Sequence, residues 1–199
     1  MTTTGRVGRD VLLRRGFLLE YATLAWNVVG IVILGVAAWT ARSVALAGFG
    51  LDSVIEVAAS VVVVWELSGT GKARQRRALR LIGVAFAALA VYLAAQSTVV
   101  LAAGFHPHHS AAGIAWTAVT AVVMFALAAG KARTGGALDN PVLRTEGRVT
   151  FIDGMLAVAV LVGLALNAGL GWWWADPVAG YVLVYYAARE VWNIVHIGH

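Results

Sequence analysis

Residues 43–67 read SVALAGFGLDSVIEVAASVVVVWEL and place two carboxylates, Asp52 and Glu56, inside an otherwise largely apolar stretch. This stretch is long enough to cross the roughly 30 Å hydrocarbon core of a bilayer as an α-helix. The four-residue spacing puts both side chains on one helical face, about 6 Å apart. Two neighbouring carboxylates repel each other unless a proton or a cation lies between them. This face therefore predicts half of an intramembrane cation site.

The composition indicates a membrane protein with a single transmembrane domain over residues 1–199. Hydrophobic residues make up 60% of the chain and charged residues only 13%, against about 25% charged residues in soluble domains. The chain has no cysteine, which excludes disulfides and thiolate ligands for soft metals. It also lacks a Gly-x-Ser-x-Gly elbow, a phosphate loop and a His-Glu-x-x-His motif, so no enzyme class is indicated. The arginine-rich, alanine-rich composition is typical of a GC-rich bacterial genome, so we expect the membrane to be a bacterial inner membrane.

Hydropathy predicts an all-α fold of six transmembrane helices, at about residues 17–39, 43–67, 81–103, 111–130, 149–168 and 171–195. Basic residues precede the first span and fill the second and fourth loops, where the fourth holds Lys131, Arg133, Arg144 and Arg148. The opposite side holds only Arg42. This asymmetry predicts that both termini are cytoplasmic. It also explains the net charge of +5 as a topology signal, with no nucleic-acid partner implied.

The fifth predicted span carries its own acid, Asp153. The first three spans begin inside and the last three outside, so the geometry permits a 3+3 inverted repeat with spans two and five as counterparts. At 1.5 Å per residue, Asp52, Glu56 and Asp153 lie about 13, 19 and 22 Å from the outer ends of their spans. These similar depths allow the three carboxylates to converge. The alternative for Asp153, which is close to the inner end, is capping or snorkelling.

Three sequence stretches carry a resemblance to a known family: SVALAGFGLDSVIE in span two, LRTEGRVTFID leading into span five, and WWADPVAGYVL at the start of span six. They resemble motifs of the cation diffusion facilitator family of divalent-metal transporters, in its short bacterial form without a C-terminal cytoplasmic domain. The resemblance implies that Asp52, Glu56 and Asp153 are metal ligands. It also implies a homodimer, for which small residues such as Ala47 and Gly50 permit close helix contact.

The sequence departs from the family pattern at Val149, where the family places His or Asp four residues before the fifth-span acid. A fourth ligand would then come from water, from Thr150 or from Asn27, although a buried amide such as Asn27 equally serves as contact between helices. Glu20 lies about one turn inside the cytoplasmic edge of span one, where we expect an interfacial role. Oxygen-rich ligation without histidine favours Mn²⁺, Fe²⁺ or Co²⁺, whereas the resemblance favours Zn²⁺.

The sequence therefore predicts a secondary transporter that exports a divalent cation in exchange for protons, by alternating access around a midplane carboxylate site. Protonation of the acids on the acidic side of the membrane would release the ion. The rival interpretation is a membrane protein that binds metal or partners but does not transport. Proton-coupled metal flux in proteoliposomes separates these two functions.

Overall fold

The computed structural model describes residues 3–41, 44–69, 71–104, 110–174, 178, 181, 184–185, 187–189 and 191–194 of the 199-residue chain. Within these ranges the chain forms five long helices and no strand. The helices are α1 (Thr3–Ala41), α2 (Val44–Leu67), α3 (Lys72–Ala103), α4 (Ala111–Ala137) and α5 (Pro141–Leu170). The described residues from 178 onward fall within the sixth predicted span and are all helical.

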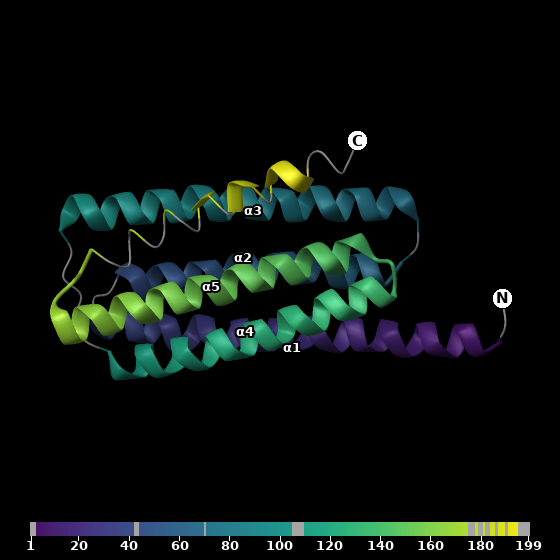
Figure 1. Ribbon diagram of the computed structural model, residues 1–199, viewed down its shortest axis with the longest axis horizontal. Coiled ribbons are helices and arrows are strands. Elements are labelled where there is room, and N and C mark those ends of the chain that lie inside the picture. The colour runs from purple at the N-terminus through teal and green to yellow at the C-terminus, as the bar shows by residue number, and fades with distance from the viewer. Residues whose placement is uncertain are drawn as a thin grey trace.

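Helices α1, α2, α4 and α5 pack into a bundle, and α3 packs beside it against α2 and α5 (Figure 1). The described residues from 178 to 194, which we call the C-terminal segment, run along α3 (Figure 1). The Tyr181 hydroxyl lies 2.6 Å from that of Thr98 near one end of α3, and Ile194 contacts Gly83 near the other. The four-helix bundle therefore encloses the core in which the predicted carboxylates lie, while α3 and the C-terminal segment form a separate layer.

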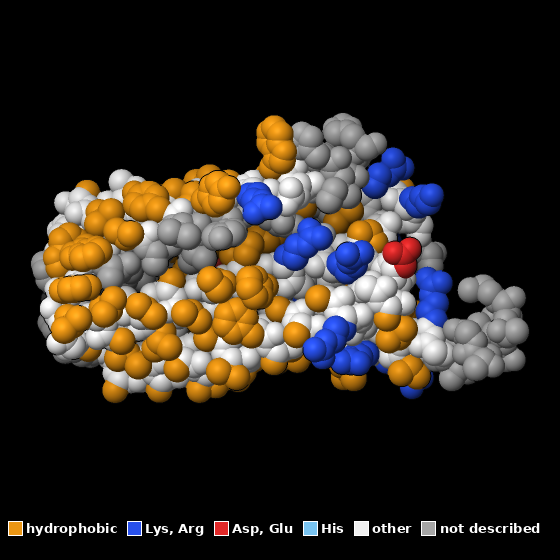
Figure 2. Space-filling model, viewed as in Figure 1, with side chains coloured by type: hydrophobic (Ala, Val, Ile, Leu, Met, Phe, Trp, Pro, Cys, Tyr) orange, Lys and Arg blue, Asp and Glu red, His pale blue; other side chains and the backbone are white. Residues whose placement is uncertain are grey.

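The outer surface of the bundle is apolar, as expected of a protein surrounded by lipid. Val84, Val91 and Val122 have 67%, 70% and 70% of their surface exposed, and hydrophobic side chains cover much of the face seen in Figure 2. Within the described part of the chain, four helical segments are long and apolar enough to cross a membrane: Gly8–Thr40, Lys72–Ala103, Ala111–Ala137 and Pro141–Leu170. Lysine and arginine side chains gather toward one end of the molecule (Figure 2), the pattern that sets orientation in a membrane.

Several helices are longer than the predicted spans. α1, α3 and α5 begin at Thr3, Lys72 and Pro141, about two to four turns earlier than hydropathy predicted, because polar residues continue the helix beyond the apolar part. α4 runs to Ala137, so Lys131 lies inside a helix and the prediction that it belongs to a loop is wrong. The six-span count, the inverted repeat, the cytoplasmic termini and the single domain stay predictions.

A tight turn joins α4 to α5 and fixes the alignment of the two helices. Asp139 adopts a positive φ of 51°, and Asn140 caps α5 by accepting hydrogen bonds from the backbone amides of Val142 at 2.9 Å and Leu143 at 3.0 Å. Pro141, the first residue of α5, suits this position because its missing N–H would have no partner in the helix. The Asn140 amide also donates to Glu66 of α2 at 3.0 Å, which ties the turn to the bundle.

Glycines then allow the backbones of α4 and α5 to approach closely. A β-carbon at Gly147 of α5 would lie 3.1 Å from the backbone nitrogen of Ala132, and one at Gly135 of α4 would lie 2.8 Å from that of Arg144. Both distances are too short for ordinary van der Waals contact, so neither site accepts a side chain without movement of a helix. This close contact brings Lys131 of α4 within reach of polar groups on α5.

Candidate cation site

The bundle core contains an unusual number of charged side chains. Each is at most 2% exposed, although an isolated charge is strongly disfavoured away from water. They come from all four helices of the bundle: Glu20 of α1, Asp52 and Glu56 of α2, Lys131 of α4, and Glu146 and Asp153 of α5. A core of this kind must hold its charges by mutual pairing, by protonation or by binding ions.

Two polar stripes, one on α2 and one on α5, face each other and account for most of these contacts. In each stripe the residues are three or four positions apart, which places them on one helical face: Asp52, Glu56 and Ser60 on α2, and Asp153, Thr150 and Glu146 on α5. They meet as three pairs along an antiparallel contact. Asp52 meets Asp153, the Thr150 hydroxyl donates to Glu56 at 2.7 Å, and the Ser60 hydroxyl donates to Glu146 at 3.2 Å.

One end of this contact is the acid trio, Asp52, Glu56 and Asp153. The Asp52 and Asp153 carboxylates are close enough to share a hydrogen bond when one is protonated, and Glu56 interacts electrostatically with both. Oδ2 of Asp52 and both oxygens of Asp153 are buried without a hydrogen-bond donor in the described part of the chain. The structure thus brings the three predicted acids together and leaves oxygen lone pairs available to a proton or a cation.

The acid trio is not already arranged as a metal centre. Among the described residues, no group of three or more His, Cys, Asp or Glu side chains could hold a metal ion as it stands. A bound divalent ion draws oxygen ligands to about 2.0–2.6 Å, so the carboxylates of the trio would have to move closer together. The role of these three residues as metal ligands stays a prediction.

The other end of the contact is what we call the lysine cage, formed by Lys131, Glu20, Glu146 and Thr150. The Lys131 ammonium donates to Glu146 Oε1 at 2.7 Å and to the Thr150 hydroxyl at 3.0 Å. It also forms an ion pair with Glu20 Oε2 at 3.1 Å. All four side chains have no exposed surface. Of the three donors of the ammonium group, two form hydrogen bonds with Glu146 and Thr150, and Glu20 lies beside it as an ion-pair partner.

Thr150 connects the lysine cage to the acid trio. Its hydroxyl oxygen accepts from Lys131 while its hydrogen is donated to Glu56. The ammonium can only donate, so the direction of the first hydrogen bond is fixed, and with Glu56 ionised the single hydrogen of the hydroxyl points to that carboxylate. As a candidate ligand, Thr150 is close to Glu56, and its oxygen already has one partner in Lys131.

The remaining candidate, Asn27, is also buried. Its amide nitrogen donates to the carbonyl of Thr23, one turn earlier on α1, at 3.0 Å. Val149, at the family's expected ligand position, is 3% exposed and belongs to the apolar core. Its side chain offers no ligand, as the sequence indicated.

The structure corrects the expectations for Glu20 and Lys131, and it shows a further buried charged residue, Glu146, that the sequence analysis did not single out. Glu20 is fully buried and paired with Lys131, so the interfacial role is wrong; α1 packs against α4 at this level. Lys131 is the one basic residue of the predicted fourth loop that is buried, whereas Arg133, Arg144 and Arg148 are exposed. Glu146 lies in the stretch LRTEGRVTFID, but its burial next to Lys131 was not predicted. Its spacing of four residues from Thr150 puts both side chains on one face of the helix, and this spacing could have indicated the contact.

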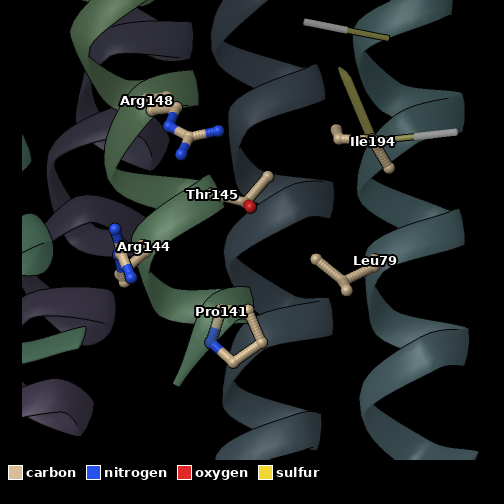
Figure 3. A pocket seen from close by; sticks show the side chains of 6 residues that line it. All are labelled: Leu79, Pro141, Arg144, Thr145, Arg148 and Ile194. Carbon is tan, nitrogen blue, oxygen red and sulfur yellow. The ribbon is translucent and has the colours of Figure 1, made fainter. Parts of the chain in front are cut away.

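A cavity of about 210 Å³ lies near the basic end, between α5, α3 and the C-terminal segment. It is lined by Leu79, Pro141, Arg144, Thr145, Arg148 and Ile194 (Figure 3). Two guanidinium groups on one wall make this cavity repulsive to cations. It is therefore not a second candidate for the cation site.

Membrane-length helices around a core of buried carboxylates define a multi-pass membrane protein of the kind that handles cations. Residues 77–196 match the family model described as the cation efflux transmembrane domain. Because the match covers more than half of the chain, the protein belongs to the cation efflux family. It is accordingly a transporter of divalent metal cations and not an enzyme. No curated protein matches the chain.

The family model matches only some of the residues of the candidate site. Asp153, Lys131 and Glu146 lie inside residues 77–196, whereas Asp52 and Glu56 lie outside them. The family assignment therefore rests on α3 to the C-terminal segment. The case for the two α2 carboxylates rests on their burial and their contacts with α5.

Proposed function

We propose that the acid trio binds a divalent cation at the centre of the bundle and that the protein exports this ion from the cytoplasm in exchange for protons. The observation that supports this most directly is the pairing of Asp52 with Asp153 beside Glu56. Three buried acids that repel one another are strongly disfavoured in the fully ionised form unless a proton or a further cation binds among them. Either protons or a metal ion must therefore occupy the trio at every stage of a transport cycle.

Competition between protons and metal supplies the coupling. Carboxylates must lose their protons before they can coordinate an ion, so binding of metal releases protons and acid releases metal. With the site open alternately to the two sides of the membrane, an inward proton gradient then drives metal outward. We expect the apparent affinity for metal to rise as the pH rises.

The oxygen ligands of the trio, with Thr150 or Asn27 as additional ligands, favour a hard or intermediate ion such as Mn²⁺, Fe²⁺ or Co²⁺. Family membership keeps Zn²⁺ a candidate, so the ion is a question for titration. We further propose a homodimer in a bacterial inner membrane, with contact through the membrane spans.

Metal flux in proteoliposomes tests this function. We expect the wild-type chain to move Mn²⁺ or Zn²⁺ in response to a pH gradient, and Asp52→Asn to reduce this flux to the level of empty vesicles. The matched control is Asp139→Asn, which makes the same chemical change in the α4–α5 turn. Asparagine tolerates the positive φ of this position, so this control should keep its flux.

The two ways of failing are distinct. Equal flux in Asp52→Asn and in the wild-type chain would contradict a role for the acid trio. Metal binding by the wild-type chain without any flux would instead favour the rival, a membrane protein that binds metal and does not transport it.

A further inference from the structure

The lysine cage has the features of a second cation site whose occupant is part of the chain. The Lys131 ammonium is surrounded by oxygens of Glu146, Thr150 and Glu20 at 2.7, 3.0 and 3.1 Å. These oxygens come from α5 and α1, and Ser60 of α2 adds a hydroxyl on Glu146. Carboxylate and hydroxyl oxygens from several helices are the donor set that a hard cation prefers.

Lys131 has more carboxyl groups around it than its own neutralisation requires. One carboxylate would balance one ammonium, yet Lys131 contacts both Glu20 and Glu146. Oε1 of Glu20 and Oε2 of Glu146 are buried and have no hydrogen-bond partner in the described part of the chain. An excess of buried carboxylate oxygen is unfavourable for a purely structural ion pair, whereas a site for a divalent ion needs it.

We propose that Lys131 is a tethered cation that fills a second carboxylate site, formed by Glu20, Glu146 and Thr150, and keeps free metal ions out of it. Among the described residues of the bundle core, the acid trio is then the place left for a free ion. Because Thr150 touches both sites, two divalent ions bound side by side would share one hydroxyl, and each would weaken the binding of the other without abolishing it. The lysine avoids this competition by supplying a single, fixed positive charge.

This inference extends the proposed function and is tested apart from it. Lys131→Gln removes the ammonium and keeps a side chain of similar length. Calorimetric titration of the full chain in detergent with Mn²⁺ alone should then show one more bound ion per chain than the wild type shows. The same comparison in an Asp52→Asn background isolates the lysine cage, since the acid trio is disabled there. In that background we expect no bound ion with Lys131 present and one with Lys131→Gln.

Two matched variants separate charge from packing. Lys131→Arg keeps the positive charge, so the number of bound ions should equal that of the wild type. The double variant Lys131→Gln, Glu146→Gln removes one carboxylate from the emptied cage, and the additional ion should be lost.

The outcomes decide the two proposals independently. If the wild-type chain binds no ion but Lys131→Gln binds one, the proposed function fails and the tethered cation stands. If Lys131→Gln binds no more Mn²⁺ than the wild type in either background, the tethered cation is wrong. Lys131→Gln that cannot be purified from cells grown with or without added Mn²⁺ would also overturn it, because an emptied cation site is stabilised by metal and a broken structural pair is not.

Discussion

The acid trio and the lysine cage lie at neighbouring levels of the same bundle, yet they balance charge in different ways. In the lysine cage, Lys131 supplies a fixed positive charge between Glu20 and Glu146. In the acid trio, Asp52 and Asp153 lie against each other and near Glu56, and among the described residues neither forms an ion pair with a basic side chain. This difference indicates which of the two regions can exchange its balancing cation with the solution. A covalently attached cation cannot leave, so only the acid trio can load and release an ion.

The largest effect should follow when the cage loses its cation. Lys131→Met leaves two buried carboxylates unpaired, and breaking a buried pair in this way costs about 3–5 kcal/mol. We expect the metal-free variant to unfold at a clearly lower denaturant concentration than the wild type. The double variant Lys131→Met, Glu146→Gln should recover part of the loss. Equal stability of Lys131→Met and the wild type would show that the cage is not charged as described.

Removing a charge from the acid trio should not lower the stability of the metal-free protein. Asp52→Asn lets the new amide donate to Asp153, whose oxygens have no other donor among the described residues, so the metal-free protein should keep or gain stability. The stabilisation by metal should vanish, which amounts to about 2.7 kcal/mol at a metal concentration of 100 times Kd. Thermal unfolding with and without Mn²⁺ measures both quantities. A lower melting temperature together with an intact metal-dependent shift would contradict the proposed site.

Thr150→Val tests the connection between the two regions. The change keeps the shape of the side chain but removes the hydroxyl that joins Lys131 to Glu56. Loss of a buried hydrogen-bond partner costs about 1–3 kcal/mol, and Glu56 should also become a poorer ligand because its orientation is no longer fixed. We expect a moderate loss of stability and weaker Mn²⁺ binding, both measured by titration calorimetry and thermal unfolding. Thr145→Val, at a buried threonine near the start of α5, is the matched control and should leave binding unchanged.

The smallest effect is a change of preference between metals. Val149→His places an imidazole one turn from Asp153, at the position where the resemblance puts a ligand. Imidazole favours Zn²⁺ over the harder ions, so the ratio of Zn²⁺ to Mn²⁺ affinity should rise. Competition titrations measure this ratio. An unchanged ratio would mean that residue 149 does not face the ion.

The sequence predicted the helices and the acid trio because both depend on local information. A long apolar run defines a membrane helix, and an acid within it is conspicuous. Helical rise also placed the three acids at comparable depths, although by depth alone Asp153 would be matched with Glu56, whereas the structure brings it next to Asp52. The lysine cage depends instead on how helices pack. Lys131 follows an apolar run and precedes arginines, so its position by itself resembles a loop. Only the extension of α4 to Ala137 and the close contact at Gly147 bring it into the core.

Glu20 illustrates the same limit. Its distance from the end of the predicted span indicated the interface, but burial depends on which helix covers that level of α1. The fully buried ion pair with Lys131 arises from the packing of α1 against α4. The contacts of Glu20 and Lys131 were thus missed because their partners lie on other helices, and the local sequence does not indicate which helices pack together.

The α4–α5 turn has a consequence for how the chain enters the membrane. Lys131 and Glu146 belong to one helical hairpin, and the turn capped by Asn140 lies between them. A lysine opposes insertion of a membrane helix, by up to roughly 2.5–3.5 kcal/mol at the helix centre and by less toward an end, where Lys131 lies, and Glu146 is present in the same hairpin to neutralise it. The two charges can therefore pair as soon as the hairpin forms, before α1 and α2 are in place around it. α4 and α5 would then be inserted as a unit, and Glu20 would join a lysine that is already paired.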